Sequence, residues 1–182
     1  MATAPPAQPE EADLIEGVVL DTPAPAPRAG EDAGVNAPSG RACEKGWYYY
    51  PTNRDKDYHK GVGAEQANYN GTSRTAKSTF VSQVSGTVGI AVSGEVKVTL
   101  KQLVAEEEAK FGVNLSASLT AKIGNTIMVD TPSHKTTYGR YGVYRLKAHG
   151  YSQYTHANCT KGTKKSATVY TPRRVGWAIW ES

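Results

Sequence analysis

Residues 78–100 read STFVSQVSGTVGIAVSGEVKVTL, and residues 113–129 read VNLSASLTAKIGNTIMV. Apolar residues take the even positions of the first stretch (Phe80, Val84, Val88, Ile90, Val92, Val96, Val98, Leu100) and the odd positions of the second (Val113, Leu115, Leu119, Ile123, Ile127, Val129). Alternation with a period of two predicts strands with one apolar and one polar face. Because strands usually have roughly 3–10 residues, we expect each stretch to be one unusually long strand or two strands with a bend at a glycine such as Gly86 or Gly94.

The segment between the two stretches has helical periodicity instead. Its apolar residues share one helical face: Leu100, Leu103, Val104 and Phe111. Gly112 suits the end of such a helix. We therefore predict one short helix, at about residues 101–111, at the tip of a β-hairpin. Residues 106–108 are three glutamates that diverge around the helix axis, which favours a solvated face over a metal or acid site.

Aromatic and β-branched residues predict further strands at 47–50, ended by Pro51, and at 138–154, 168–172 and 175–180. The tyrosines of the first could form a platform for sugars or bases, but a strand packed on both faces is the commoner arrangement. Residues 41–182 should therefore form a mostly-β domain, an elongated antiparallel sheet or β-sandwich with one short helix.

Residues 1–40 differ in composition and predict an extended N-terminal arm. Of the 21 lysines and arginines only Arg28 lies there, against seven of the 17 acids, and prolines recur. Such a segment has no core and favours extended conformations. One apolar island interrupts it, and we expect the island to dock on a protein partner by strand addition through Leu14, Ile15, Val18, Val19 and Leu20.

The chain opens with neither a basic segment nor an apolar one, so we expect no secretory signal peptide. No apolar run approaches the roughly 20 residues of a transmembrane helix. The predicted location is a virion or the cell exterior, reached after assembly in the cytoplasm.

Basic residues dominate the end of the chain. Residues 131–180 contain no acid and nine bases, Lys135, Arg140, Arg145, Lys147, Lys161, Lys164, Lys165, Arg173 and Arg174. They could be a solvated face, or a surface for an anionic partner such as lipid, glycan or the acidic arm. Nucleic acid is disfavoured because no nucleic-acid-binding motif accompanies the charge.

Two cysteines, Cys43 and Cys159, bracket the predicted domain. Their position favours a disulfide over two free thiols, and closing so long a loop would stabilise the fold by up to about 5 kcal/mol. No motif supports Cys159 as a catalytic nucleophile.

No enzyme signature is present: the sequence lacks G-x-S-x-G, H-E-x-x-H, P-loop and dinucleotide-binding patterns. His149, His156 and Cys159 could be imagined as zinc ligands, but their spacing matches no standard site. We predict no catalytic residues, no metal and no cofactor.

The pattern of residues along the chain resembles that of known β-rich proteins. Ser/Thr/Gly alternating with Val/Ile, the EAKFGVNLSASLT segment at 108–120, Val-Asp-Thr-Pro and Tyr-Gly-x-Tyr look like the elongated region of aerolysin-like pore-forming proteins. Over roughly 43–180 the chain also resembles small secreted actinobacterial β-rich proteins of unknown role. The aerolysin-like resemblance implies an amphipathic hairpin, here 78–100 with 113–129, that inserts into a membrane and oligomerises.

The sequence favours the first of two functions and leaves the second as the alternative. The first is a non-enzymatic structural or adhesive component of a larger homo-oligomeric or multi-copy assembly, for example a phage head-decoration or tail-associated protein. The second is an aerolysin-like pore-forming or membrane-binding protein.

Overall fold

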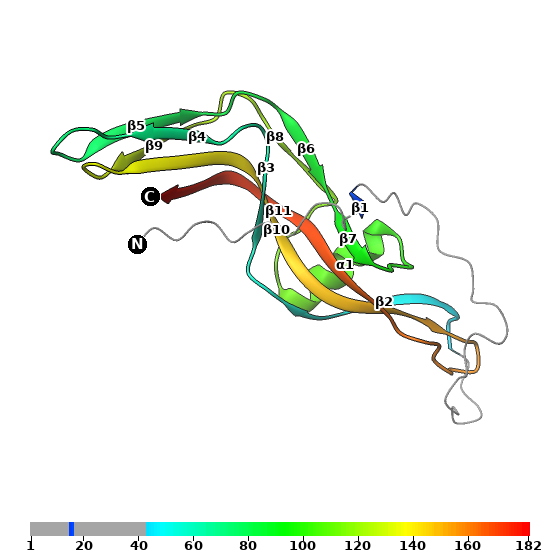
Figure 1. Cartoon of the computed structure of the whole chain (residues 1–182). Helices are drawn as coiled ribbons and strands as arrows, with labels where there is room; N and C mark the ends of the chain where they lie inside the picture. The colour runs from blue at the N-terminus through cyan, green and yellow to red at the C-terminus, as the bar shows by residue number, and fades with distance from the viewer. Residues whose placement is uncertain (1–14, 17–42) are drawn as a thin grey trace.

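The computed structural model describes residues 15–16 and 43–182, and Figure 1 shows an elongated molecule. The described chain is mostly β and antiparallel with one helix, which confirms the predicted fold class. Its elements are β1 (Ile15–Glu16), β2 (Gly46–Arg54), β3 (Tyr58–Gly61), β4 (Gln66–Tyr69), β5 (Ala76–Val81), β6 (Gly86–Gly89), β7 (Ala91–Gly94), α1 (Leu100–Phe111), β8 (Ser118–Ala121), β9 (Thr126–Thr131), β10 (Thr136–Thr155) and β11 (Lys165–Glu181). The boundary of the arm at residue 40 lies outside the described residues.

Strand β10 is the centre of the main sheet. One of its edges pairs with β11 from Thr137 to Ser152, and the other pairs in turn with β4, β3 and β2. β7 then pairs with the outer edge of β11. β10 and β11 run through both halves of the molecule (Figure 1). Every other strand of this sheet is therefore positioned by this pair.

The core changes side in the middle of β10. Tyr141 and Val143 pack in a cluster with β6 and β8, whereas Leu146 and Ala148 pack beside α1. Because neighbouring strand residues point to opposite faces, residues of odd and even number face opposite sides. The change coincides with a shift in the register with β11 after Tyr144, so two small cores cover opposite faces of one sheet.

Both ends of α1 are capped, the C-terminal end by Gly112 as the sequence predicts and the N-terminal end by Thr99. The Thr99 hydroxyl accepts a hydrogen bond from the Gln102 backbone, and the Gln102 side chain accepts one from the Thr99 backbone. Gly112 ends the helix in the left-handed conformation, with φ of 63°. Leu103 is fully buried in a cluster with Tyr49 and Val169, so α1 covers β2 and β11.

Cys43 and Cys159 form the predicted disulfide, which spans 116 positions. It ties the segment before β2 to the loop between β10 and β11, and the Cys43 backbone also donates to the Ala157 carbonyl at 3.0 Å. The start of the described domain is thereby fixed to this loop.

Two parts of the β structure differ from the sequence prediction. The first long stretch is three strands, β5, β6 and β7, and its main break lies at residues 82–85, just before Gly86. β2 continues through Pro51, which pairs with Gly150 where the register is irregular. β2 is an edge strand. A proline is tolerated there because the N–H group that it lacks is not needed for a hydrogen bond to a further strand.

Candidate functional site

Parts of the two alternating stretches form one hairpin, which we define as residues 76–89 and 118–131. The predicted hairpin of 78–100 with 113–129 is too long, because residues 91–94 pair with β11 of the main sheet instead. Ala76 pairs with Thr131 in the β5–β9 ladder. Ten residues further on, Gly86 pairs with Ala121 in the β6–β8 ladder, ten residues earlier in the returning strand. No residue is gained or lost between the ladders, so the hairpin keeps one register along its whole length.

The faces of the hairpin differ in chemistry. Phe80, Val88 and Ala121 are buried on the inner face. On the outer face Lys77 forms an ion pair with Asp130, four of the other strand positions are threonine, and Val81 and Met128 are exposed apolar side chains there. The hairpin is therefore amphipathic across its width.

Serine hydroxyls take over the pairing at the break between the two ladders. The Ser82 backbone donates to the Asn125 carbonyl at 2.8 Å, and its hydroxyl donates to the Lys122 carbonyl at 2.8 Å. The Ser85 hydroxyl accepts from the Ile123 backbone at 2.8 Å. Val84 and Ile123, by contrast, are exposed apolar side chains at this break. The break bends the hairpin without interrupting its register.

The hairpin contacts the main sheet through side chains. Among the described residues, the β5–β9 and β6–β8 ladders share no backbone pairing with the seven-stranded sheet. Instead the Phe80 ring lies 6.2 Å from that of Trp177 on β11, and the Trp177 indole donates to the Asn125 side chain at 2.8 Å. No backbone ladder therefore opposes separation of the two layers.

Much of the contact beneath β5 and β9 is polar. Ser78 and Thr131 are fully buried there and hydrogen bond to each other. Asn68 donates to the Ser78 hydroxyl at 2.7 Å, and Asn70 donates to the Thr131 carbonyl at 2.9 Å. Polar contacts of this kind exchange readily for water, so this part of the hairpin is less firmly held than an apolar core would be.

A buried carboxyl fixes α1 on the main sheet, where the helix covers β2 and β11 instead of lying at the hairpin tip that the sequence predicted. The Glu107 carboxyl accepts from the hydroxyls of Tyr49 at 3.3 Å and Thr171 at 2.5 Å. Burial raises the pKa of Glu107 to about 7, although both hydrogen bonds oppose the shift. The sequence interpretation of residues 106–108 as a solvated face is therefore wrong for Glu107, because its side chain turns inward between β2 and β11.

The predicted basic surface is not one surface. Arg173 and Arg174 pair with Asp57 at 2.8 and 3.6 Å, and Lys147 pairs with Asp55 at 3.3 Å. The charges of these three bases are therefore neutralised by Asp55 and Asp57. These acids lie far from the bases in the sequence, so the pairing was not predicted.

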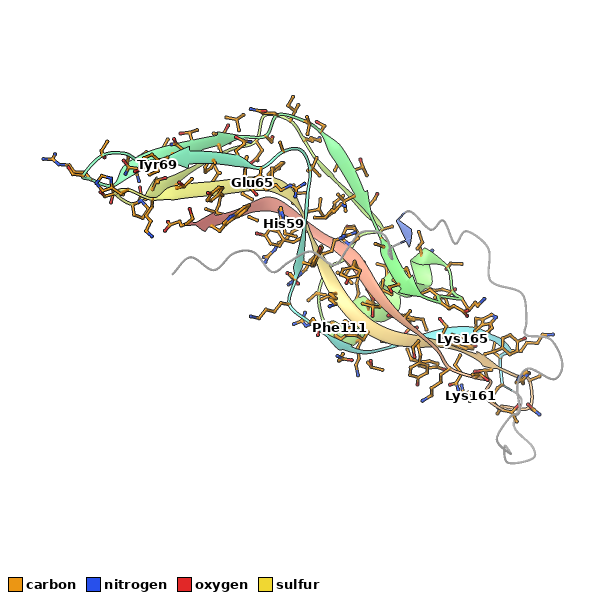
Figure 2. All side chains as sticks on the ribbon, viewed as in Figure 1. His59, Glu65, Tyr69, Phe111, Lys161 and Lys165 are labelled. Atoms are coloured by element: carbon orange, nitrogen blue, oxygen red, sulfur yellow. A yellow bond between two sulfur atoms is a disulfide. The ribbon has the colours of Figure 1, made fainter. Side chains whose placement is uncertain are left out.

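The other basic residues are scattered along the molecule. Arg140 donates to the Gly63 carbonyl at 3.2 Å. Lys135 is exposed in the turn between β9 and β10. Lys161 and Lys165 lie at the end of the molecule opposite Tyr69 (Figure 2), and Lys164 belongs to the same segment.

Arg145 contradicts the surface prediction outright. Its side chain is 1% exposed, and the rings of Tyr58 and Tyr170 lie 5.7 and 5.3 Å from its guanidinium carbon. The rings supply cation–π contact in place of water. Arg145 is thus a core residue, which alternation along β10 alone does not reveal.

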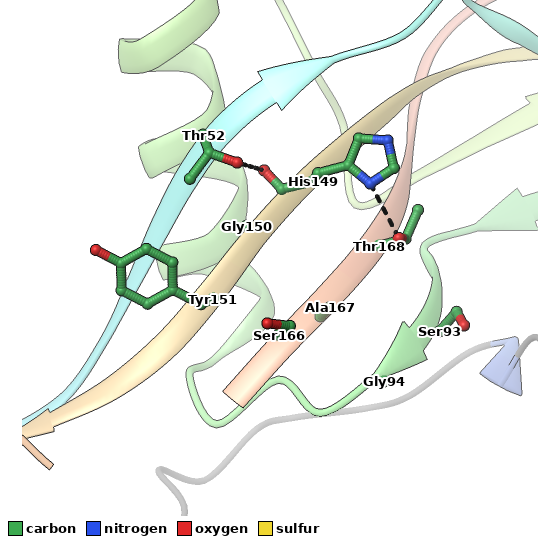
Figure 3. A pocket seen from close by; sticks show the side chains of 9 residues that line it. All are labelled: Thr52, Ser93, Gly94, His149, Gly150, Tyr151, Ser166, Ala167 and Thr168. Carbon is green, nitrogen blue, oxygen red and sulfur yellow. Dashed lines mark hydrogen bonds between the residues drawn. The ribbon is translucent and has the colours of Figure 1, made fainter. Parts of the chain in front are cut away.

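A trough crosses β2, β10, β11 and β7 on the face opposite α1 (Figure 3). Its volume is about 410 Å³, and its lining includes Thr52, Ser93, His149, Tyr151 and Thr168. Sequence analysis did not predict this trough, because its residues come from four separated segments. Alternation in β2 held one signal: Tyr49 is buried under α1, while Tyr48 and Tyr50 face the other way.

The predicted docking island is described only at Ile15 and Glu16. These two residues form β1, which pairs antiparallel with Val92 and Ala91 of β7 in the same chain. Leu14, Val18, Val19 and Leu20 lie outside the described residues. The backbone at Ile15 thus adds a strand to a sheet edge, and docking on another protein stays a prediction.

Within residues 15–16 and 43–182 no helix has both the length and the hydropathy to cross a bilayer. In the same residues no three acidic, histidine or cysteine side chains gather as a metal site. His149 instead contacts Asp55 and Thr168, and Cys159 is in the disulfide. The chain matches no family model and no curated protein.

Proposed function

We propose that this protein is a membrane-active, pore-forming protein of the aerolysin-like kind, in which the hairpin of residues 76–89 and 118–131 leaves the main sheet and enters a bilayer. The observation that carries the proposal is the unbroken register of a hairpin that shares no ladder with the described main sheet. A hairpin attached by side chains can move as a unit while it keeps its own backbone hydrogen bonds.

The dimensions and faces of the hairpin support membrane insertion. Each arm exceeds the about 9–11 residues that a membrane β-strand needs. One face carries Phe80, Val88, Leu119 and Ile127, with four polar residues among them: Ser78, Ser82, Asn125 and Thr131. The other face carries four threonines and the Lys77–Asp130 pair, with Val81 and Met128 as apolar exceptions. Barrel strands alternate in this way between lipid and a watery lumen.

The protein is expected to release a self-quenched dye from lipid vesicles and to form an oligomer that survives heating in detergent. Vesicles of neutral and of anionic lipid distinguish general membrane activity from charge-driven binding. Absence of both release and oligomer would contradict the proposal.

A role in a multi-copy assembly, such as a virion, is the second candidate. The pairing of β1 with β7 favours it, because the same edge could receive the island of a neighbouring copy. Deletion of residues 2–40 should then weaken self-association measured by light scattering. Unchanged association would remove this candidate and leave the membrane proposal untouched.

A further inference from the structure

The trough on the main sheet lies between two rows of side chains that cross the strands. One row is Ser93, Thr168 and His149, which pair across β7, β11 and β10. The second row, two residues along, includes Ser166 and Tyr151. Between the rows lie Gly94, Ala167 and Gly150, whose row faces the α1 side. The floor of the trough is therefore backbone.

The glycines of the floor are required by packing. A Cβ on Gly94 would lie 2.5 Å from the Ser166 carbonyl oxygen, and one on Gly150 would lie 2.7 Å from the Tyr50 carbonyl oxygen. These close backbone approaches keep the strands together beneath the trough. The sheet is continuous beneath the trough. The trough is hollow because three residues of the two rows that border it, Ser93, Thr168 and Ser166, have small side chains.

Hydrogen bonds orient the first wall of the trough. The His149 Nε2 atom lies 2.9 Å from the Asp55 carboxylate, and its Nδ1 lies 3.1 Å from the Thr168 hydroxyl. The contacts of Asp55 with His149 and then Lys147 lower the pKa of its carboxyl, so it is ionised and only accepts. The Nε2 atom therefore donates to Asp55, and the Thr168 hydroxyl held at Nδ1 keeps at least one lone pair that can accept from a ligand.

Polar groups without protein partners complete the lining. Among the described residues, the hydroxyls of Ser93 and Ser166 make no hydrogen bond. Each can donate one hydrogen bond and accept others. The trough thus offers several hydroxyl groups beside a comparable apolar area, which suits a ligand that carries both hydroxyls and C–H faces, as a sugar ring does.

Lysines and tyrosines bound the second wall. The Lys164 ammonium lies 4.4 Å from the centre of the Tyr151 ring, which lies 5.2 Å from the Tyr50 ring. The Lys161 ammonium donates to the Tyr50 hydroxyl at 3.2 Å. Lys164 is exposed and lies against Tyr151 beside the trough, whereas Lys161 is held further along the sheet at Tyr50 and Thr155, and neither lysine lines the trough itself.

We infer that the trough binds an acidic saccharide, with sugar hydroxyls on the Ser93–Thr168 wall and a carboxylate or sulfate beside Lys164. The volume is in the range of small-molecule sites, so a bare anion would leave most of it empty. A nucleic-acid base is disfavoured because an ammonium already covers a face of Tyr151. This site lies on the main sheet outside the hairpin, so it goes beyond the proposed function and stands or falls independently of membrane activity.

Calorimetric titration of the full chain with a sulfated heparin tetrasaccharide tests the inference, with uncharged maltotetraose and an eight-nucleotide thymidine strand as comparison ligands. We expect binding of the tetrasaccharide, weaker binding of maltotetraose and the weakest binding of the nucleotide strand. Lys164→Ala should weaken tetrasaccharide binding about tenfold, the size expected for a lost charged hydrogen bond. Ser166→Tyr, at an exposed position, should fill the trough and abolish binding.

Lys135→Ala is the matched control, since it removes an exposed lysine from the turn between β9 and β10. It should bind like the unaltered protein. Equal losses in Lys135→Ala and Lys164→Ala, or unchanged binding in Ser166→Tyr, would show attraction by overall charge and overturn the inference. So would tighter binding of the thymidine strand, or no binding of the tetrasaccharide. Circular dichroism of each variant confirms that the β fold is kept.

Discussion

A variant with Val62→Cys and Gly86→Cys is expected to release no dye from vesicles when oxidised and to regain full release when reduced. Val62 follows β3, and its backbone donates to the Tyr141 carbonyl of β10 at 2.7 Å, so it belongs to the main sheet. Gly86 begins β6 of the hairpin. A Cβ built on Gly86 lies 3.8 Å from that of Val62, which is a suitable separation for a disulfide. The bond would lock the two layers that the proposed function requires to separate.

The two single substitutions are the matched controls for this lock. Each changes the packing between Val62 and Gly86 without crosslinking it, so each should release dye with or without reductant. The unaltered protein treated with the same reductant controls for loss of the Cys43–Cys159 disulfide. Full release by the oxidised double variant, with its crosslink verified by mass, would show that the hairpin does not need to leave the sheet.

Glu107 is expected to make the folded protein more stable in acid than in base. Its pKa is about 7 when folded and near the ordinary 4.5 when unfolded. The unfolded chain therefore releases this proton first as the pH rises. The contribution of Glu107 to the free energy of unfolding should fall between about pH 4.5 and 7, by about 3 kcal/mol in order of magnitude, and then level off.

Urea denaturation of Glu107→Gln at several pH values checks this expectation. The amide keeps the shape of the neutral acid and cannot ionise, so the variant should match the unaltered protein near pH 4 and exceed it in stability near pH 8. Glu106→Gln removes an exposed neighbouring charge and should follow the unaltered profile. A Glu107→Gln profile parallel to that of the unaltered protein would mean that Glu107 is not the titrating group.

Local patterns in the sequence predicted the elements well because local physics determines them. Alternation located the hairpin strands, and the Thr99 and Gly112 caps delimit a helix that propensity and periodicity already indicated. The disulfide was predictable because Cys43 and Cys159 have no other cysteine to pair with. Each of these inferences needed only residues near in sequence or unique in type.

Long-range features were missed for a physical reason. The inward turn of Glu107 depends on hydroxyls from Tyr49 and Thr171, which lie 58 and 64 positions away. The burial of Arg145 depends on rings from β3 and β11. The sequence next to a charged residue does not reveal such distant partners. Charged side chains are usually exposed, so both residues were predicted to be exposed.

Fluorescence at neighbouring hairpin positions tests the central claim most directly. Both cysteines of the chain are in the disulfide, so a cysteine introduced at Leu119, Thr120, Thr126 or Ile127 is the only thiol to label. With a dye at each site and a quencher attached to the lipid chains, membrane insertion predicts strong quenching at positions 119 and 127 and weak quenching at 120 and 126. If none of the four dyes is quenched under conditions where the protein is bound to vesicles, the hairpin does not enter the membrane.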